Sequence, residues 1–222
     1  MSRMFRSITR TWNCFVGCRF DCTYCNAKKA ALTRFKHIDR YKDGFYPHLI
    51  ESEFSKTFKP REFVFIGYMG DISFATPAEA LRINTHIRKF PDTRFLLCTK
   101  NPYCFFKWDD LEWPDNVVIA TTIETNRLNR LSKAPTTYDR FATLLRYHHP
   151  HKMVSIEPIM DFDPATLLCW IDDLQPEIVE VGADNYKNSL PEPDGEKLDE
   201  LLARLRQIVP IVIEKDGLDR IR

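Results

Sequence analysis

The chain has 222 residues, of which 44% are hydrophobic, and its formal net charge at pH 7 is +1. This length suits one hydrophobic core better than two independent ones, so we expect a single domain over residues 1–222. No run approaches the roughly 18 apolar residues that a transmembrane helix needs, which excludes a helical membrane protein and predicts no membrane partner.

Seven apolar segments of strand length follow one another along the chain. Continuous apolar runs of this length are typical of buried parallel strands. The predicted strands are Ser7–Trp12, Phe63–Ile66, Phe95–Cys98, Val117–Ala120, Met153–Ile156, Ile178–Val181 and Ile211–Ile213.

Helix starts are marked between these strands. Thr76-Pro77-Ala78-Glu79 is a capping box with proline at the first helical position, and Asp163-Pro164 repeats the cap and the proline. Thr136 with Asp139 marks a third start, and the polar, proline-rich stretch from Lys187 to Glu196 predicts a loop. Strands that alternate with helices predict an α/β fold, either a partial (β/α) barrel of six or seven parallel strands or a doubly wound sheet.

Three of the seven cysteines lie close together after the first predicted strand. Cys18, Cys22 and Cys25 follow one another at spacings of four and three residues. Three thiolates suit a soft metal centre, and they are one short of the usual shell of structural zinc or a 4Fe-4S cluster. A cluster on this triplet would keep one iron without a protein ligand, and an open iron is a place for chemistry.

Cys14 leaves other interpretations open. With the triplet it supplies four thiolates for a tetrahedral zinc site, which would make the chain a zinc-stabilised nucleic-acid-binding module. An iron-sulfur electron carrier is a further alternative. A disulfide framework is disfavoured, because the cysteine count is odd and no apolar signal segment follows Met1, so we expect a cytoplasmic location.

The cysteine spacing, with Tyr24 directly before Cys25, resembles that of the radical SAM superfamily. The chain also resembles a compact branch of this superfamily that is common in phages and prophages, and it is similar to spore photoproduct lyase-like members. The segments that carry this resemblance are Thr11-Trp12-Asn13, Gly67–Asp71, Leu97–Pro102 and Ser155–Pro158. The resemblance implies the partial barrel form, a 4Fe-4S cluster held by Cys18, Cys22 and Cys25, and S-adenosylmethionine as the second cofactor.

The ends of the predicted strands carry the polar residues that such barrels use for chemistry. Glycines let a ligand approach the backbone closely, and the resemblance implies that the segment after the second strand holds the methionine amino group. A tight turn ahead of Thr76 is the alternative. The superfamily often has glutamate where this chain has aspartate. The cofactor-binding residues expected around this group are Tyr24, Gly67, Met69, Gly70 and Asp71.

Four further residues at strand ends receive expected roles. A zwitterionic cofactor with ribose hydroxyls needs a cation for its carboxylate and hydrogen-bond acceptors for its hydroxyls. Lys100 is the candidate for the first role and Glu124 for the second. Glu157 is expected to orient cofactor or substrate, with a structural buried ion pair as the alternative. Cys98 is expected to return a hydrogen atom to a substrate radical, with a small buried hydrophobe as the alternative.

The implied activity is that of a radical SAM enzyme, which cleaves S-adenosylmethionine reductively to a 5'-deoxyadenosyl radical that abstracts hydrogen from a substrate. It requires an external one-electron donor such as flavodoxin or ferredoxin. Residues 1–61 hold 13 Lys and Arg against 5 Asp and Glu, whereas the remainder holds 19 against 26. This basic first quarter would suit a phosphorylated or nucleic-acid substrate, with a solvated charged face as the alternative. Together with the resemblance to a branch that acts on a nucleobase, it makes a nucleobase in a nucleotide or nucleic acid a candidate substrate, with a peptide or small metabolite as the alternative.

Overall fold

The computed structural model describes residues 5–108 and 111–222, and the chain divides into two compact units. The N-terminal unit comprises Ile8–Val118 and Leu131–Ala134. The C-terminal unit comprises Ile119–Arg130 and Pro135–Arg222, together with the described residues before Ile8. The single domain over residues 1–222 stays a prediction.

Parallel strands form the frame of the N-terminal unit. β4 pairs with β1 on one side, where Phe65 lies beside Thr11, and with β5 on the other, where Phe65 lies beside Leu96. All four residues of β4 are buried, as a continuous apolar run predicts for a central strand. The elements of this unit are β1 (Arg10–Trp12), β2 (Phe15–Val16), α1 (Asn26–Leu32), η1 (Asp39–Tyr41), β3 (His48–Leu49), η2 (Glu51–Ser55), β4 (Phe63–Ile66), η3 (Ile72–Phe74), α2 (Pro77–Ile87), β5 (Arg94–Thr99) and α3 (Cys104–Lys107).

An aromatic core packs behind β1 in this unit. The fully buried Trp12 ring lies 4.8 Å from the His86 ring of α2 and 5.3 Å from the Phe58 ring, and its Nε1 donates to the carbonyl of Glu53 at 3.0 Å. These contacts fix β1 against α2 and η2, and thereby fix the chain that leaves β1 toward the cysteines.

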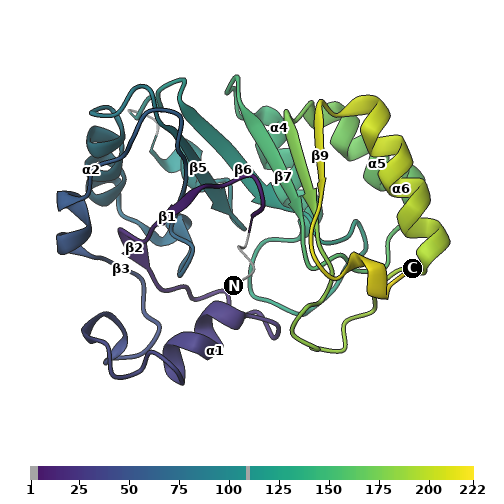
Figure 1. Ribbon diagram of the computed structural model, residues 1–222, viewed down its shortest axis with the longest axis horizontal. Coiled ribbons are helices and arrows are strands. Elements are labelled where there is room, and N and C mark those ends of the chain that lie inside the picture. Colours follow the sequence, from purple (N-terminus) through teal and green to yellow (C-terminus); the bar gives the residue numbers. More distant parts are fainter. Residues whose placement is uncertain (1–4, 109–110) are drawn as a thin grey trace. The chain divides into compact units, whose positions relative to one another are not determined.

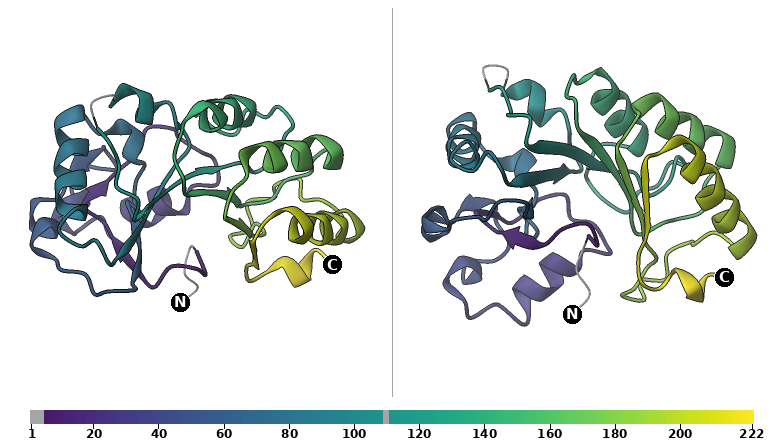
Figure 2. Two further views of the ribbon diagram at one scale, coloured as in Figure 1. Left: turned by 90° about the horizontal axis from the view of Figure 1, so that it is seen from above. Right: turned by 45° about the horizontal axis from the view of Figure 1, so that its top comes forward.

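The C-terminal unit continues the alternation of strands and helices. β7 pairs in parallel with β6 and with β8, and β8 with β9. Helices α4, α5 and α6 lie side by side along the same side of these strands (Figures 1 and 2). The elements are β6 (Val117–Thr122, whose first two residues belong to the N-terminal unit), α4 (Thr137–Arg146), β7 (Lys152–Ile156), α5 (Pro164–Leu174), β8 (Ile178–Val181), α6 (Gly195–Ile208), β9 (Ile211–Glu214) and η4 (Leu218–Arg220).

The predicted strands and helix starts are confirmed. The strand order is β1-β4-β5-β6-β7-β8-β9, seven strands at the predicted places. Thr76 and Thr136 each cap a helix in a reciprocal capping box, and Asp163 caps α5 ahead of Pro164. None of the described helices is both long and apolar enough to cross a membrane.

Two boundaries differ from the prediction, each for a local reason. The first strand begins at Arg10 rather than Ser7, because Ser7 donates its backbone N–H to the buried Glu180 carboxylate at 2.9 Å within the C-terminal unit. The predicted loop ends early, because Asp194 accepts from the backbone N–H of Lys197 at 2.8 Å and starts α6 at Gly195. The expectation of a missing signal segment rests partly on Met1–Met4, which lie outside the described residues.

Candidate functional site

The cysteine triplet lies on the loop between β2 and α1 in the N-terminal unit, and each of the three side chains is partly buried. Cys18 is tied to the next segment through its backbone N–H, which donates to the Phe45 carbonyl at 3.1 Å. Two sulfurs accept hydrogen bonds from backbone N–H groups. The Cys18 sulfur accepts from Phe20 at 3.4 Å, and the Cys25 sulfur accepts from Lys28 at 3.3 Å as the N-cap of α1.

The electrostatics show that the three sulfurs are neighbours. Burial raises the pKa of Cys18 well above that of a free thiol, and the Asp71 carboxylate and the other two cysteines of the triplet raise it further. Three soft sulfur donors on one loop, with backbone N–H groups directed at two of them, fit an iron-sulfur cluster chemically. Among the described residues no group of three His, Cys, Asp or Glu side chains forms a ready metal site.

Cys14 has different surroundings. It is fully buried, and burial raises the pKa of its thiol, with a further rise from Glu53 and an opposing effect of Lys56. Cys14 is 0% exposed, whereas all three cysteines of the triplet are partly exposed. This difference favours the three-cysteine interpretation over a four-cysteine zinc site.

The glycine segment after β4 packs against the chain just before Cys18. The backbone N–H of Gly17 donates to the Met69 carbonyl at 2.9 Å, and the N–H of Asp71 donates to the Gly17 carbonyl at 3.1 Å. A Cβ on Gly70 would lie 2.8 Å from the N and O atoms of Gly17. The close approach that requires glycine at position 70 is therefore made by the protein's own backbone. Whether Gly67, Met69 and Gly70 also contact a cofactor stays a prediction.

Asp71 joins the ends of β4 and β5. Its buried carboxylate accepts from the Thr99 hydroxyl at 2.6 Å, from the backbone N–H of Lys100 at 2.9 Å and from that of Ser73 at 3.0 Å. Because these contacts already engage both oxygens, Asp71 acts first as a positioning residue, and it lies near enough to Cys18 to raise the pKa of that thiol.

Lys100 reaches the cysteine loop from the end of β5. Its Nζ donates to the phenolic oxygen of Tyr24 at 3.0 Å and lies 5.0 Å from the centre of the Tyr24 ring. A cation is thereby held directly beside the residue that precedes Cys25. Cys98 lies two residues earlier in β5 and is partly exposed, so its thiol is not a fully buried hydrophobe, and its role stays a prediction.

The two remaining predicted residues belong to the C-terminal unit, and each has a basic partner. Glu124, 1% exposed, accepts from Nη1 of Arg140 at 2.9 Å. Glu157 forms an ion pair with the buried Lys215, in space that Gly182 leaves open, since a Cβ there would lie 2.8 Å from Oε1 of Glu157. Both glutamates are therefore engaged in ion pairs within the protein, as the structural alternative for Glu157 predicts. Their roles toward ligands stay predictions.

Sequence reasoning missed four residues that build these sites. Gly17 and Asn13 support the glycine segment, Asn13 by accepting from the backbone N–H of Met69 at 3.1 Å. Arg140 and Lys215 pair with the predicted carboxylates. Asn13 and Lys215 had a usable signal, because both lie within two residues of the end of a predicted strand.

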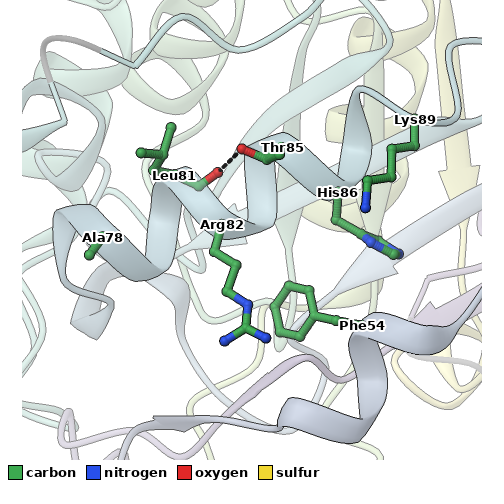
Figure 3. Close-up of a pocket in the computed structure, with 7 residues that line it drawn as sticks. All are labelled: Phe54, Ala78, Leu81, Arg82, Thr85, His86 and Lys89. Atoms are coloured by element: carbon green, nitrogen blue, oxygen red, sulfur yellow. Dashed lines mark hydrogen bonds between the residues drawn. The ribbon is translucent and has the colours of Figure 1, made fainter.

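A surface pocket along α2 contains none of the predicted site residues (Figure 3). The Arg82 guanidinium lies over the Phe54 ring and is paired with Glu51, so its charge is compensated. The pocket does not compete with the cysteine loop as the candidate site. Its lining residues are Phe54, Ala78, Leu81, Arg82, Thr85, His86 and Lys89.

The fold is similar to that of spore photoproduct lyase. A doubly substituted variant of that enzyme, with bound AdoMet and dinucleoside spore photoproduct, matches at a TM-score of 0.61 and 11% identity over 96% of this chain and 78% of that chain. The lyase complexed with dinucleoside spore photoproduct matches at a TM-score of 0.58 and 10% identity, and the match covers 91% of this chain and 75% of that chain. This likeness concerns the fold, and it confirms the predicted class, an α/β partial barrel of the radical SAM type.

Comparison of the sequence with curated proteins finds no match. The family model described as "Protein of unknown function (DUF5131)" matches residues 5–174, and the chain belongs to that family.

Proposed function

We propose that this chain is a radical SAM enzyme, in which Cys18, Cys22 and Cys25 hold a 4Fe-4S cluster and S-adenosylmethionine binds beside them. When bound, these two groups would supply the reductive cleavage that yields a 5'-deoxyadenosyl radical, which takes a hydrogen atom from the substrate. The observation that carries the proposal is the cysteine loop itself, with Lys100 held on Tyr24 and Asp71 beside Cys18.

The residues around the loop have separable tasks in this proposal. Lys100 would pair with the carboxylate of the methionine moiety, since its ammonium already lies at the loop. Asp71 holds the backbone of Lys100 and so fixes the start of that side chain. The apolar cluster that packs on Cys18 and Cys25, which includes Val16, Ala31 and Phe45, would keep water from one side of the site.

The substrate in this proposal is a nucleobase in a nucleotide or nucleic acid. Support comes from the similarity in fold to a lyase that binds a dinucleoside photoproduct and from the basic first quarter of the chain. Phosphate contacts would release counterions, so binding of a strand should weaken steeply as salt rises. Cys98 and Glu157 remain the candidates for returning hydrogen and for orienting the substrate.

Anaerobic purification with iron, sulfide and zinc analysis tests the first part of the proposal. We expect iron and sulfide in equal amounts and, after reduction, release of 5'-deoxyadenosine from S-adenosylmethionine. Zinc without sulfide would instead support the binding module, and a cluster that never cleaves the cofactor would support the electron carrier.

The substrate class is tested separately with deuterated nucleotides and oligonucleotides. Transfer of deuterium into 5'-deoxyadenosine is the expected result. An active enzyme that binds no nucleotide, DNA or RNA at low salt would overturn the nucleobase substrate and leave the cofactor chemistry standing.

A further inference from the structure

Residues 26–46 form a cover over the cysteine loop within the N-terminal unit. The inner side chains of this segment include Ala31, Tyr41 and Phe45, and they belong to the apolar cluster against which Cys18 and Cys25 pack. α1 starts directly at Cys25, and the segment returns to the loop where the Phe45 carbonyl accepts from the N–H of Cys18. The outer surface of this cover therefore lies immediately over the candidate cluster site.

The outer surface is strongly basic. The segment contains six Lys and Arg against two Asp. Two of the six are compensated, because Lys28 pairs with Asp21 and Arg40 pairs with Glu53. The other four are exposed and form no ion pair with any residue that the structure describes: Lys29, Arg34, Lys36 and Lys42.

Exposed apolar side chains are interleaved with these charges. Tyr46 is 63% exposed, Leu32 44% and Ile38 37%. We define the cover face as these three residues together with Lys29, Arg34, Lys36 and Lys42. Apolar and aromatic side chains within a charged rim are typical of protein interfaces. A phosphate backbone would leave these exposed apolar side chains uncovered, whereas a partner protein would bury them, so the composition favours a protein over a nucleic acid.

We propose that the cover face docks a small acidic electron-carrier protein of the flavodoxin class. The inference rests on the proposed function, because reductive cleavage needs one electron from outside. In the transfer the carrier's reduced flavin loses one electron and the cluster gains it, with no proton or group passing between the proteins. Opposite charges steer such encounters, and electron-transfer complexes bury little surface and are short-lived, which suits a face defined by seven exposed side chains.

The test compares two triple variants of the whole protein with assembled cluster. The first changes Lys29, Lys36 and Lys42 to Glu. The matched control changes Lys89, Arg146 and Arg204 to Glu, which shifts the net charge equally at exposed positions outside the cover face. Each set includes one residue from the last turn of a helix.

Stopped-flow mixing with reduced flavodoxin measures the rate at which the cluster bleaches, and calorimetry measures the affinity of the complex. At low salt we expect the cover-face variant to lose about tenfold or more in the association rate, with a flatter salt dependence, while the control keeps the wild-type rate. Reduction by dithionite should be equal in all three proteins, which shows that the cluster is intact. Tyr46→Ala should weaken the complex without changing its salt dependence.

Three outcomes would overturn the proposal. Flavodoxin reduces the cover-face variant as fast as the wild type, or both triple variants slow equally, or the cover-face variant loses oligonucleotide binding while flavodoxin still reduces it normally. In the last case the face would bind nucleic acid. Failure of the proposed function is a separate result, since the purified wild type would then contain no cluster to reduce.

Discussion

Lys100 donates a hydrogen bond from Nζ to the phenolic oxygen of Tyr24 at 3.0 Å, which joins the end of β5 to the residue before Cys25. If Lys100 binds the carboxylate of S-adenosylmethionine, Lys100→Ala should weaken cofactor binding by about 1.5–3 kcal/mol, the usual range for a hydrogen bond to a charged group. Tyr24→Phe should weaken it less, because the ring remains.

Calorimetry on cluster-loaded protein measures both effects. Lys107→Ala is a matched control, since its Nζ also lies over a tyrosine ring, that of Tyr103, at 5.8 Å. Equal affinities for the Lys100→Ala variant and the wild type would remove Lys100 from the cofactor site.

Gly70→Ala should damage the cysteine loop itself. A Cβ at this position would lie 2.8 Å from two backbone atoms of Gly17, the residue directly before Cys18. We expect a loss of about 1–3 kcal/mol in the free energy of unfolding, as for other overpacked sites, and less iron per chain. Gly67→Ala is the control, because its Cβ would meet only the Phe15 carbonyl, at 3.7 Å, so the cost comes from its φ of +76° and iron content should hold. If Gly70→Ala keeps a normal iron content but binds S-adenosylmethionine more weakly, the glycine is needed for the approach of the cofactor instead.

Replacing cysteines one at a time separates ligands from core residues. Cys18→Ala, Cys22→Ala and Cys25→Ala should each abolish the cluster signal in electron paramagnetic resonance. Cys14→Ala should keep the signal and lower the free energy of unfolding by about 1 kcal/mol, because it leaves a small cavity in the core. Loss of the metal from Cys14→Ala, or zinc in the wild type, would contradict the three-cysteine site. The exposed Cys169→Ala provides the unaffected control.

Glu124→Ala tests whether the Glu124–Arg140 pair is structural. Both side chains are at least 96% buried, so removing one partner strands a charge and should cost about 3–5 kcal/mol in the free energy of unfolding. Replacing both residues by Met should cost less than the single change. Chemical denaturation measures these differences. A stable Glu124→Ala protein with weakened cofactor binding would instead support the ribose role.

The free energy of unfolding should fall as the pH drops below about 6.5, the pKa of a free histidine. Burial among aromatic rings lowers the pKa of His86, so the unfolded chain takes up a proton that the folded chain resists. Above this range both states are neutral and the effect vanishes. Denaturation of His86→Gln across pH 5–8 should show a weaker dependence, whereas Phe141→Leu, which removes a buried ring stacked on Trp170 in the C-terminal unit, should lower stability without changing the dependence. A His86→Gln protein with the wild-type slope would assign the dependence to other groups.

Local signals explain which parts of the fold the sequence predicts. The fully buried run of β4 and the capping box at Thr76 depend on residues adjacent in the chain, and both are found where expected. The pairing of β2 with β3 escapes prediction, because two-residue strands carry no periodicity.

The sequence predicts which residues lie at the candidate site but not which residues contact one another there. Asp71 looks like a ligand-binding carboxylate in the sequence, yet two of its hydrogen bonds come from Thr99, the last residue of β5, and from Lys100 directly after it. The glycine at position 70 is likewise required by the close approach of the Gly17 backbone, which lies more than fifty residues earlier in the chain. Such roles depend on which strand ends meet, and that information is spread over the whole topology.

The Cys25 sulfur has two tasks, since the atom proposed to bind iron also accepts the hydrogen bond that starts α1. A thiolate accepts such a bond more strongly than a thiol, so loading the metal would tighten the first turn of the helix. Oxidation or alkylation of this one sulfur would remove a metal ligand and loosen the attachment of residues 26–46 in a single event. Damage at Cys25 would therefore be detectable as faster proteolysis of this segment, even in protein that was never loaded with its cofactors.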